Sequence, residues 1–365
     1  MAIWRSTIST LRCGRIGLVL AAVVTAMISQ AGVTFEAAAV LPRERISLND
    51  DWRFAKNDPP GNTVSLIYDV RPQGRGAGRG PGEQQAAAPP AEPAPPVLKQ
   101  WILPTGNDFV KDPAKKAVRP AGNPGEDVDY VRAEFDDSSW KRLDLPHDWG
   151  TEGPFTTTGR GATGRLPFYG VGWYRKKLDI AQADAGKSIF LDIDGAMSYA
   201  TVWLNGRLVG GWPYGYASWR VNLTPYVKPG GVNQLAIRLD NPENSSRWYP
   251  GGGIYRNVWL VKTSPVHVGQ WGTYVTTPEA SAAGATVTVR VTVDNDSNRE
   301  ANVSVATQVF ALDDSGNRTG TAVASIASAD LRVGAGASAV TEGQGIVAKP
   351  RLWGPPPGQK PNRYV

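Results

Sequence analysis

The sequence predicts an all-β protein in which a jelly-roll β-sandwich is followed by an immunoglobulin-like β-sandwich. Short apolar runs of strand length recur between turn residues over residues 167–261, and none shows helical periodicity over three turns. Asn205 and Gly206 separate two of these runs, and this dipeptide is the strongest short signal for a β-hairpin. Residues 286–293 and 302–310 then alternate cleanly between apolar and polar. Regular short strands joined by turns are typical of sandwiches and jelly rolls.

Composition and charge narrow the class of protein. The length of 365 residues suits about two domains, and a hydrophobic content of 41% supports a real core. A net charge of +6 could indicate nucleic acid, but Arg75 and Arg79 lie in a Gly/Pro tract and no dense basic run remains. We therefore expect no nucleic-acid partner. The two histidines and the one cysteine, Cys13, cannot form a transition-metal site of the usual kind.

The start of the chain has the pattern of an export signal. Arg5, Arg12 and Arg15 precede an apolar run at residues 16–28, and three alanines at residues 37–39 offer a cleavage site. The apolar run is shorter than the roughly 20 residues that a membrane helix needs. We predict a signal peptide at residues 1–39, a periplasmic or secreted mature chain, and no membrane anchor after cleavage.

Residues 40–262 are expected to form the jelly roll. An opening strand is predicted at residues 45–54. Residues 71–128 are rich in Gly, Pro, Ala and polar residues, and such a composition cannot bury a core, so they are predicted to be a disordered or loop insertion. The later strands are predicted at residues 172–178, 188–193, 200–204, 207–209, 219–223, 234–239 and 257–261.

Residues 263–365 are expected to form the smaller immunoglobulin-like sandwich. Besides the two alternating runs, strands are predicted at residues 323–327 and 338–347. The domain is predicted to be incomplete at its C-terminus, because residues 363–365 lead into a strand at which the sequence stops.

A glycine-rich turn stands out within residues 246–260. Three consecutive glycines at 251–253 allow backbone angles closed to other residues and let another surface approach closely. Arg247, Trp248 and Tyr249 precede them, and two flat amphipathic rings beside a cation suit sugar faces and hydroxyls. The alternative is a structural corner with aromatic packing between strands, and the turn taken alone favours that interpretation.

Four motifs resemble those of one enzyme family. They are LPHDW at 145–149 with EGPF at 152–155, GVGWYR at 170–175, VWLNG at 202–206, and SRWYPGGGIYRNVW at 246–259. In order and spacing they resemble the N-terminal, galactose-binding-like jelly roll of glycoside hydrolase family 2. The β-galactosidase branch is a better match than the β-glucuronidase or β-mannosidase branches. The resemblance covers residues 45–260 and continues more weakly to residue 347, over the family's immunoglobulin-like domain.

The resemblance implies a catalytic (β/α)₈ barrel after these two domains, and the sequence shows no strand–helix pattern for one. A retaining glycosidase needs two carboxylates about 5–5.5 Å apart, one as acid/base and one as nucleophile. In the family both are glutamates on barrel strands, the acid/base one preceded by asparagine. This chain has no Asn-Glu dipeptide, and glutamates such as Glu152, Glu243 and Glu279 are scattered. We assign no catalytic residue to it.

The resemblance also implies where sugar would be contacted. Jelly rolls of the family lend loop residues to the rim of the barrel's pocket, and the matching positions are residues 247–251 and 156–168. We predict Arg247, Trp248 and Tyr249 as substrate-binding residues. Several family members have an aspartate about where Arg247 stands, although arginine can still donate hydrogen bonds. The alternative role for this turn is a structural corner against the barrel.

His147 and several tryptophans are each compatible with a structural or a functional role. A His-Asp pair can do acid–base work, but within LPHDW we favour a structural His147 that locks a turn by hydrogen bonds. Three tryptophans in strand patterns are predicted to be core, namely Trp173, Trp203 and Trp259. Four aromatic residues among Gly and Pro are candidates for exposed aromatic surface or for packing against a neighbouring domain, namely Trp212, Tyr214, Tyr216 and Trp219.

Two functional hypotheses follow. The first is that the chain is the N-terminal portion of an exported, β-galactosidase-like, retaining glycoside hydrolase, with a β-galactoside or related carbohydrate and the missing barrel as its partners. It would need no cofactor in this chain, although Mg²⁺ or Na⁺ could bind in the barrel. The second is a stand-alone carbohydrate-binding module or scaffold that works without hydrolysis.

Overall fold

The computed structural model describes residues 43–60, 112–115, 122–153, 168–241 and 251–365. Within these residues every regular element is a strand or a short 3₁₀ turn, so the all-β prediction is confirmed. None of the described helices is long and apolar enough to cross a membrane. The predicted signal peptide and most of the predicted insertion lie outside the described residues.

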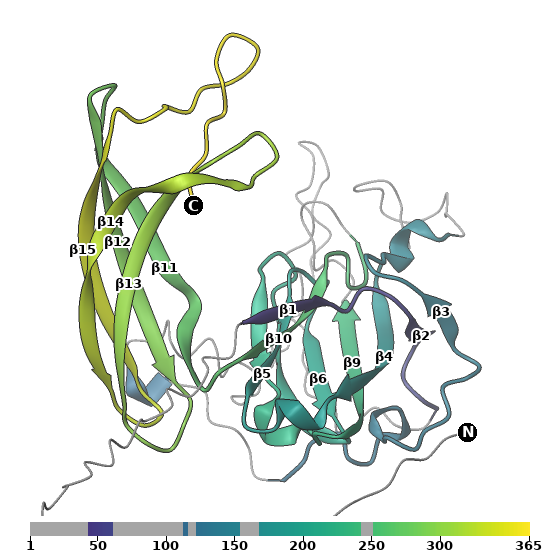
Figure 1. Cartoon of the computed structure of the whole chain (residues 1–365). Coiled ribbons are helices and arrows are strands. Elements are labelled where there is room, and N and C mark those ends of the chain that lie inside the picture. The colour runs from purple at the N-terminus through teal and green to yellow at the C-terminus, as the bar shows by residue number, and fades with distance from the viewer. Residues whose placement is uncertain (1–42, 61–111, 116–121, 154–167, 242–250) are drawn as a thin grey trace, which may run out of the picture. The chain divides into compact units, whose positions relative to one another are not determined.

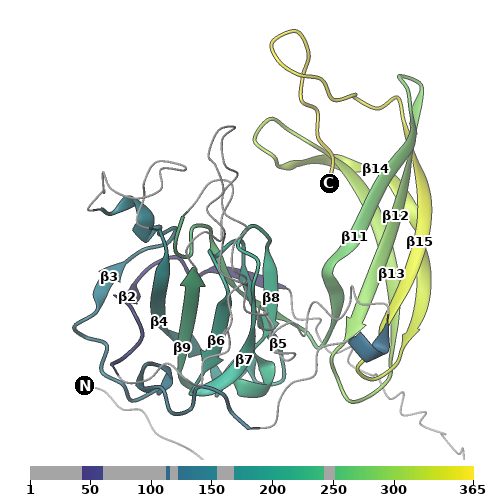
Figure 2. The same ribbon diagram turned by 180° about the vertical axis from the view of Figure 1, so that it is seen from behind.

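The first domain is a sandwich of two antiparallel sheets (Figure 1). Its strands are β1 (Glu44–Ser47), β2 (Trp52–Lys56), β3 (Lys141–Leu143), β4 (Gly170–Ile180), β5 (Ser188–Ile193), β6 (Ala200–Leu204), β7 (Arg207–Trp212), β8 (Trp219–Asn222), β9 (Gly231–Asn241) and β10 (Val258–Thr263). One sheet has the order β3-β2-β4-β9-β6-β7 and the other the order β1-β10-β5-β8. Neighbours in these sheets are mostly distant in sequence, as in a jelly roll. Figure 2 shows β4, β9, β6 and β7 side by side.

The main core of this domain lies between its two sheets. Side chains from both sheets, such as Leu191 of β5 and Ile237 of β9, are fully buried there. Burying each such side chain contributes about 1.5–3 kcal/mol. The opening strand predicted at residues 45–54 is in fact two strands. Asp51, at φ 53°, turns the chain between β1 of one sheet and β2 of the other.

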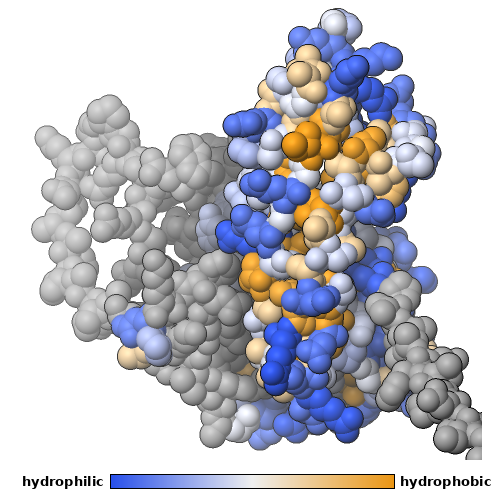
Figure 3. All heavy atoms as spheres, turned by 60° about the vertical axis from the view of Figure 1, so that its left-hand side comes forward, coloured by the Kyte–Doolittle hydropathy of each residue, from blue (hydrophilic) through white to orange (hydrophobic). Residues whose placement is uncertain are grey.

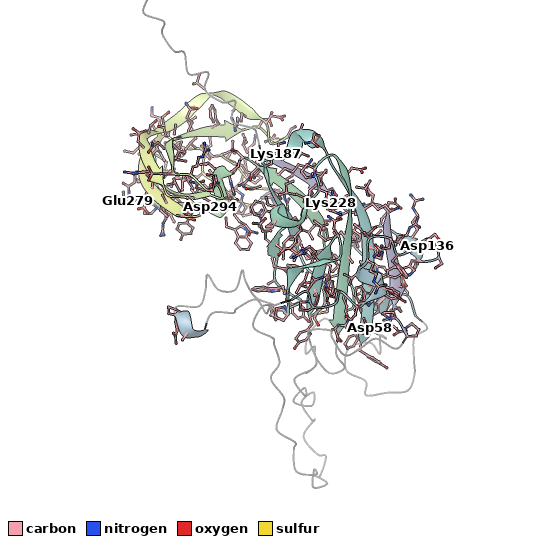
Figure 4. All side chains as sticks on the ribbon, turned by 90° about the horizontal axis from the view of Figure 1, so that it is seen from below. Asp58, Asp136, Lys187, Lys228, Glu279 and Asp294 are labelled. Carbon is pink, nitrogen blue, oxygen red and sulfur yellow. The ribbon has the colours of Figure 1, made fainter. Side chains whose placement is uncertain are left out.

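A second apolar cluster covers the outer face of the six-stranded sheet. Trp173 and Trp203 are fully buried there, with stacked rings 5.6 Å apart, which confirms their predicted core role. Residues 122–131, at the end of the predicted insertion and just beyond it, pack on them, and Trp203 Nε1 donates to the Pro124 carbonyl at 2.8 Å. Asp58, labelled in Figure 4, accepts from Trp173 Nε1 at 2.8 Å and pairs with buried Arg238.

The second domain is a smaller sandwich of five strands. They are β11 (Val266–Ala280), β12 (Gly284–Asn295), β13 (Ala301–Leu312), β14 (Arg318–Val333) and β15 (Ser338–Ala348). One sheet has the order β11-β12-β15 and the other pairs β13 with β14. Alternate residues of β12 face a core of valines, as its pattern predicted. β11 was not predicted, because register shifts after Val268 and Thr276 interrupt its alternation.

Candidate functional site

The predicted sugar-contacting residues Arg247, Trp248 and Tyr249 lie outside the described residues, as does nearly all of the matching loop at residues 156–168. What the structure describes is the base from which both loops start. Asn241 and Gly251 flank the first loop, and Phe168 ends the second. These flanking residues form the described part of the candidate site.

Asn241 joins the ends of the two loops. It is the last residue of β9 and is fully buried. Its side-chain amide donates to the Gly251 carbonyl at 2.6 Å and to the Phe168 carbonyl at 2.8 Å. One buried side chain thus holds both ends of the 242–250 loop together and ties them to the exit of the 154–167 loop. Both flanks of the 242–250 loop and the end of the 154–167 loop therefore meet at one buried side chain.

Asp148 fastens the glycine turn to the LPHDW segment. Its Oδ1 accepts from the backbone amides of Gly150 and Gly252, both at 2.8 Å. The bond to Gly150 also caps the short 3₁₀ turn Trp149–Thr151. Between the same segments, Trp149 N donates to the Gly252 carbonyl at 2.8 Å. The negative charge of a carboxylate makes such bonds stronger than bonds to a neutral acceptor.

The glycines are required by close packing against this segment. A methyl group on Gly252 would lie 2.2 Å from the Trp149 ring and 2.5 Å from the Phe168 carbonyl oxygen. Gly253, at φ 129°, would place its methyl group 2.4 Å from the His147 carbonyl oxygen. Glycine is the residue that tolerates both that angle and that approach. For residues 251–253 the structural interpretation as a corner is correct.

His147 locks the corner through hydrogen bonds at both ring nitrogens. Nδ1 lies 2.7 Å from the hydroxyl of buried Tyr174, and Nε2 lies 2.9 Å from Glu152 Oε1. Because a carboxylate only accepts, Nε2 carries the proton and Nδ1 accepts from the tyrosine. The backbone amide of His147 donates to the Ile254 carbonyl at 2.9 Å. These contacts agree with the structural role favoured for this histidine.

The electrostatics of this network keep His147 neutral. Burial lowers the pKa of His147, and the hydrogen bond to Glu152 only partly opposes that effect. Partial burial acts to raise the pKa of Glu152, but hydrogen bonds from Lys141 and His147 outweigh it and lower the pKa. Burial raises the pKa of Tyr174 well above its usual value, so its hydroxyl remains a donor.

Lys56 is a second titratable group at this edge of the domain. Its Nζ lies 4.2 Å from the centre of the Trp149 ring. Desolvation there lowers the pKa of Lys56 to about 8, against the opposing charge of Glu152. An amine with that pKa is partly neutral near pH 8. It faces the same Trp149 that supports the glycine turn.

The aromatic predictions have a mixed outcome. Tyr214 and Tyr216 are exposed, with ring centres 5.6 Å apart, as predicted for aromatic surface. Trp212 is half-buried, and the prediction of exposure is wrong for Trp219, which is 3% exposed because it faces the main core from β8. Trp259 is only half-buried, and Arg45 covers its ring at 3.7 Å.

The exposed tyrosines lie on the same end of the domain as the glycine turn. Met197 pairs with Gly253 across an isolated bridge, and Gly215, between the two tyrosines, packs on the Met197 side chain. Tyr255 donates its hydroxyl to the Gly215 carbonyl at 2.8 Å. The turn, the His147 segment and the two tyrosines therefore belong to one loop-bearing end.

The described carboxylates form no catalytic pair that the structure identifies. Glu152 is engaged by His147 and Lys141, while Glu279 lies on β11 of the second domain (Figure 4). Glu243 lies outside the described residues. The described part of the chain also contains no group of three or more His, Cys, Asp and Glu side chains that could hold a metal.

The sequence did not predict the role of Asn241, or the hydrogen bond between Asp148 and Gly252. Asn241 ends a predicted strand region, directly before a proline, and nothing in its neighbourhood distinguishes a clamp from an ordinary strand end. Asp148 was read only as the partner of His147. Its true contact, Gly252, is 104 residues away in sequence.

Both domains match models of known protein families. Residues 171–251 match the model described as glycosyl hydrolase 2 galactose-binding domain-like, and residues 266–365 match the model described as glycosyl hydrolases family 2.

Curated relatives include the β-galactosidase BoGH2A of Bacteroides ovatus, 43% identical over 63% of this chain and 26% of that protein. A putative β-glucuronidase of Formosa agariphila is 37% identical over 44% of this chain and 16% of its own length. A solved family 2 glycosyl hydrolase from Bacteroides cellulosilyticus aligns with a TM-score of 0.59 and 26% identity, over 86% of this chain and 31% of that one. The chain thus spans about a quarter or less of the length of these two curated relatives.

Proposed function

Because this chain belongs to glycoside hydrolase family 2, we propose that it supplies the sugar-binding and spacer domains of an enzyme that hydrolyses terminal β-linked galactosides. The β-galactosidase of Bacteroides ovatus supports galactose as the sugar, while the β-glucuronidase names among other relatives keep uronic acids as the competing substrate class. The reaction class is hydrolysis of an O-glycosidic bond.

The observation that carries the proposal is the shared base of the two loops. Asn241 bonds to Gly251 and Phe168, so the described residues that flank the two predicted sugar-contacting loops lie next to each other. Arg247, Trp248 and Tyr249 then meet a sugar at the rim, with the rings against its apolar face and the guanidinium donating to hydroxyls. The glycine corner supports the proposal, because Gly252 and Gly253 pack closely against Trp149 and His147 at the end of the 242–250 loop.

We propose that the residues that cleave the glycosidic bond lie in a domain other than these two. We infer a retaining, two-step displacement through a covalent glycosyl intermediate, with two carboxylates about 5–5.5 Å apart. A barrel domain beyond these 365 residues would carry both. The pattern at residues 1–39 supports export to the periplasm or the medium as part of the same proposal.

The first test is hydrolysis of a chromogenic β-galactoside by the purified chain, beside calorimetric titrations with galactose and glucuronate. We expect no turnover and at most weak, millimolar binding. Turnover abolished by Glu152→Gln would contradict the assignment of the carboxylates to another domain. Tight galactose binding without turnover would favour the stand-alone binding module. Glucuronate binding in preference to galactose would overturn the choice of sugar.

A second test examines the turn with Arg247, Trp248 and Tyr249 in a longer form of the protein that has hydrolase activity. Trp248→Ala should raise KM for the β-galactoside with a smaller effect on kcat, because the ring contributes to binding rather than to the reacting bond. Trp271→Ala is the matched control, since Trp271 lies in the second domain and is exposed. Equal KM values for the Trp248→Ala variant and the unmodified enzyme would remove this turn from the sugar site.

A further inference from the structure

Three short loops of the first domain are joined to one another by hydrogen bonds. They are residues 213–218 between β7 and β8, residues 194–195 after β5, and residues 255–257 before β10. The Asp194 amide donates to the Asn257 carbonyl at 2.9 Å, and Ser218 Oγ donates to the Asp194 carbonyl at 3.0 Å. These bonds fix the three loops relative to one another, so side chains that they carry form one built surface.

Three tyrosine rings gather where these loops meet. Tyr214 is 59% and Tyr216 is 38% exposed, and their ring centres lie 5.6 Å apart. Tyr255 is half-buried, and its hydroxyl donates at 2.8 Å to the carbonyl of Gly215, which lies between the other two tyrosines in the chain. An exposed pair of phenol rings offers flat apolar faces and hydroxyl groups to a ligand.

Arg256 adds a positive charge beside these rings. A methyl group on Gly195 would lie 2.9 Å from both Arg256 Cδ and the Tyr255 hydroxyl oxygen, so the two side chains lie side by side over this glycine. Burial raises the pKa of Tyr255, and the charge of Arg256 opposes that effect, as expected of close neighbours. Tyr255 therefore remains a hydroxyl donor, and Arg256 is the cation of the cluster.

Arg256 has no polar partner in the described part of the chain. Its side chain is exposed, and no carboxylate or carbonyl group of a described residue accepts a hydrogen bond from it. A guanidinium presents its N–H donors in a planar fork that fits a carboxylate or a tetrahedral oxyanion. A ligand that fits both the rings and this charge has an anionic group on a body with apolar faces and hydroxyls, as an acidic sugar does.

The surface of the second domain offers a different chemistry. Figure 3 shows apolar side chains in a stripe along it, and exposed aliphatic residues of this domain, such as Val340, have no hydrogen-bonding side chain. Its exposed Tyr274 also has an arginine nearby, with Arg290 Cζ 5.8 Å from the ring centre. However, Arg290 Nε lies 3.6 Å from Glu342 Oε2, so a carboxylate already balances that charge. An unpaired charge beside exposed rings distinguishes Arg256.

We propose that the cluster formed by Tyr214, Tyr216, Tyr255 and Arg256 is a carbohydrate subsite for a sugar unit that carries an anionic substituent, either a carboxylate or a sulfate ester. The rings of Tyr214 and Tyr216 contact the sugar, and Arg256 pairs with the anionic group. Both substituents present two oxygen atoms to the fork of a guanidinium. The subsite goes beyond the proposed function, because its residues lie outside both predicted sugar-contacting loops.

The test is a set of calorimetric titrations of the purified chain at low ionic strength with galactose, galacturonate and galactose 6-sulfate. These sugars share one ring and differ at C6. Arg256→Gln removes the charge and Tyr214→Ala removes a ring. Arg290→Gln is the matched control, since Arg290 also lies near an exposed tyrosine but is paired with Glu342. Acetate and inorganic sulfate are titrated as well, to separate binding of the charge from binding of the sugar.

We expect at least one of the two acidic sugars to bind about fivefold more tightly than galactose, because of its pairing with the guanidinium. Which of them does so identifies the substituent. Arg256→Gln should remove this difference, Tyr214→Ala should weaken binding of the acidic sugar, and Arg290→Gln should change neither.

Equal affinity for galactose and both acidic sugars would overturn the proposal. Acetate or sulfate binding as tightly as the acidic sugars would also overturn it, because it would show an adventitious ion only. Binding of an acidic sugar that is lost in Trp248→Ala but kept in Arg256→Gln would belong to the predicted turn rather than to this cluster. Because the proposed function depends on Trp248 and the subsite depends on Arg256, the two proposals can fail separately.

Discussion

Removing the carboxylate of Asp148 should loosen the glycine corner. In Asp148→Ala, the amides of Gly150 and Gly252 lose their acceptor, which lies 2.8 Å from each. Hydrogen bonds to a charged group contribute about 1.5–3 kcal/mol each. Asp148 is half-buried, so water replaces part of this, and we expect the free energy of unfolding to fall by about 2–4 kcal/mol.

Asp148→Asn is the matched control, because its side-chain oxygen keeps the acceptor at the same place. It should lose about 1 kcal/mol or less, the difference between a charged and a neutral acceptor. Urea unfolding followed by tryptophan fluorescence gives both free energies, and hydrogen exchange at Gly150 and Gly252 locates the change. If the alanine variant stays within about 0.5 kcal/mol of the unmodified chain, or the asparagine variant loses as much as alanine, the reasoning is refuted.

Three further predictions concern stability. Because burial lowers the pKa of His147 below its unfolded value of about 6.5, the unfolded state binds more protons between the two values. The free energy of unfolding should therefore fall as pH is lowered through that window, and His147→Gln should flatten this slope in urea titrations from pH 8 to 5. Arg175→Ala should cost about 3–5 kcal/mol, because it removes a fully buried guanidinium and leaves half-buried Asp137 without that partner. Arg142→Ala should cost under about 1 kcal/mol, because its pair with Asp51 is exposed. Gly252→Ala should cost about 1–3 kcal/mol by overpacking, and Gly358→Ala, with no atom within 4 Å of the added methyl group, should be neutral in the same thermal melts.

Local signals predicted most strands of the fold. Asn205 and Gly206 form the expected tight turn, with φ of 53° and 78°, because these residues tolerate left-handed backbone angles. β5 and β6 have the predicted bounds, since each is a short apolar run between turn residues. The pattern failed where local and global geometry differ. The turn at Asp51 divides the strand predicted at residues 45–54 into β1 and β2, which belong to different sheets. In β11, register shifts interrupt the alternation of apolar and polar residues.

For the candidate site, the sequence predicted the kinds of residue involved but not which residues contact one another. The three glycines predicted that another surface packs closely against residues 251–253. They did not identify that surface, which is formed by Trp149 and the His147 carbonyl about a hundred residues earlier in the chain. Such contacts depend on the fold of the whole domain rather than on spacing. Trp219 shows the same limit, because its Gly- and Pro-rich surroundings indicate a surface loop while its position at the start of β8 points it into the core.

The division between base and loops has a consequence for specificity. The base should tolerate little change, since replacing Asn241 or Asp148 would remove hydrogen bonds to Gly251 or Gly252, and a methyl group on Gly252 or Gly253 would clash. The contacts that hold this base come from described residues outside residues 242–250, where the side chains proposed to meet sugar lie. We therefore expect substitutions at Arg247 to change sugar binding more than they change the stability of the fold. Under the proposed function, Arg247, Trp248 and Tyr249 would set the sugar preference, while Asn241 holds Gly251 and Phe168, the described ends of the two loops, together.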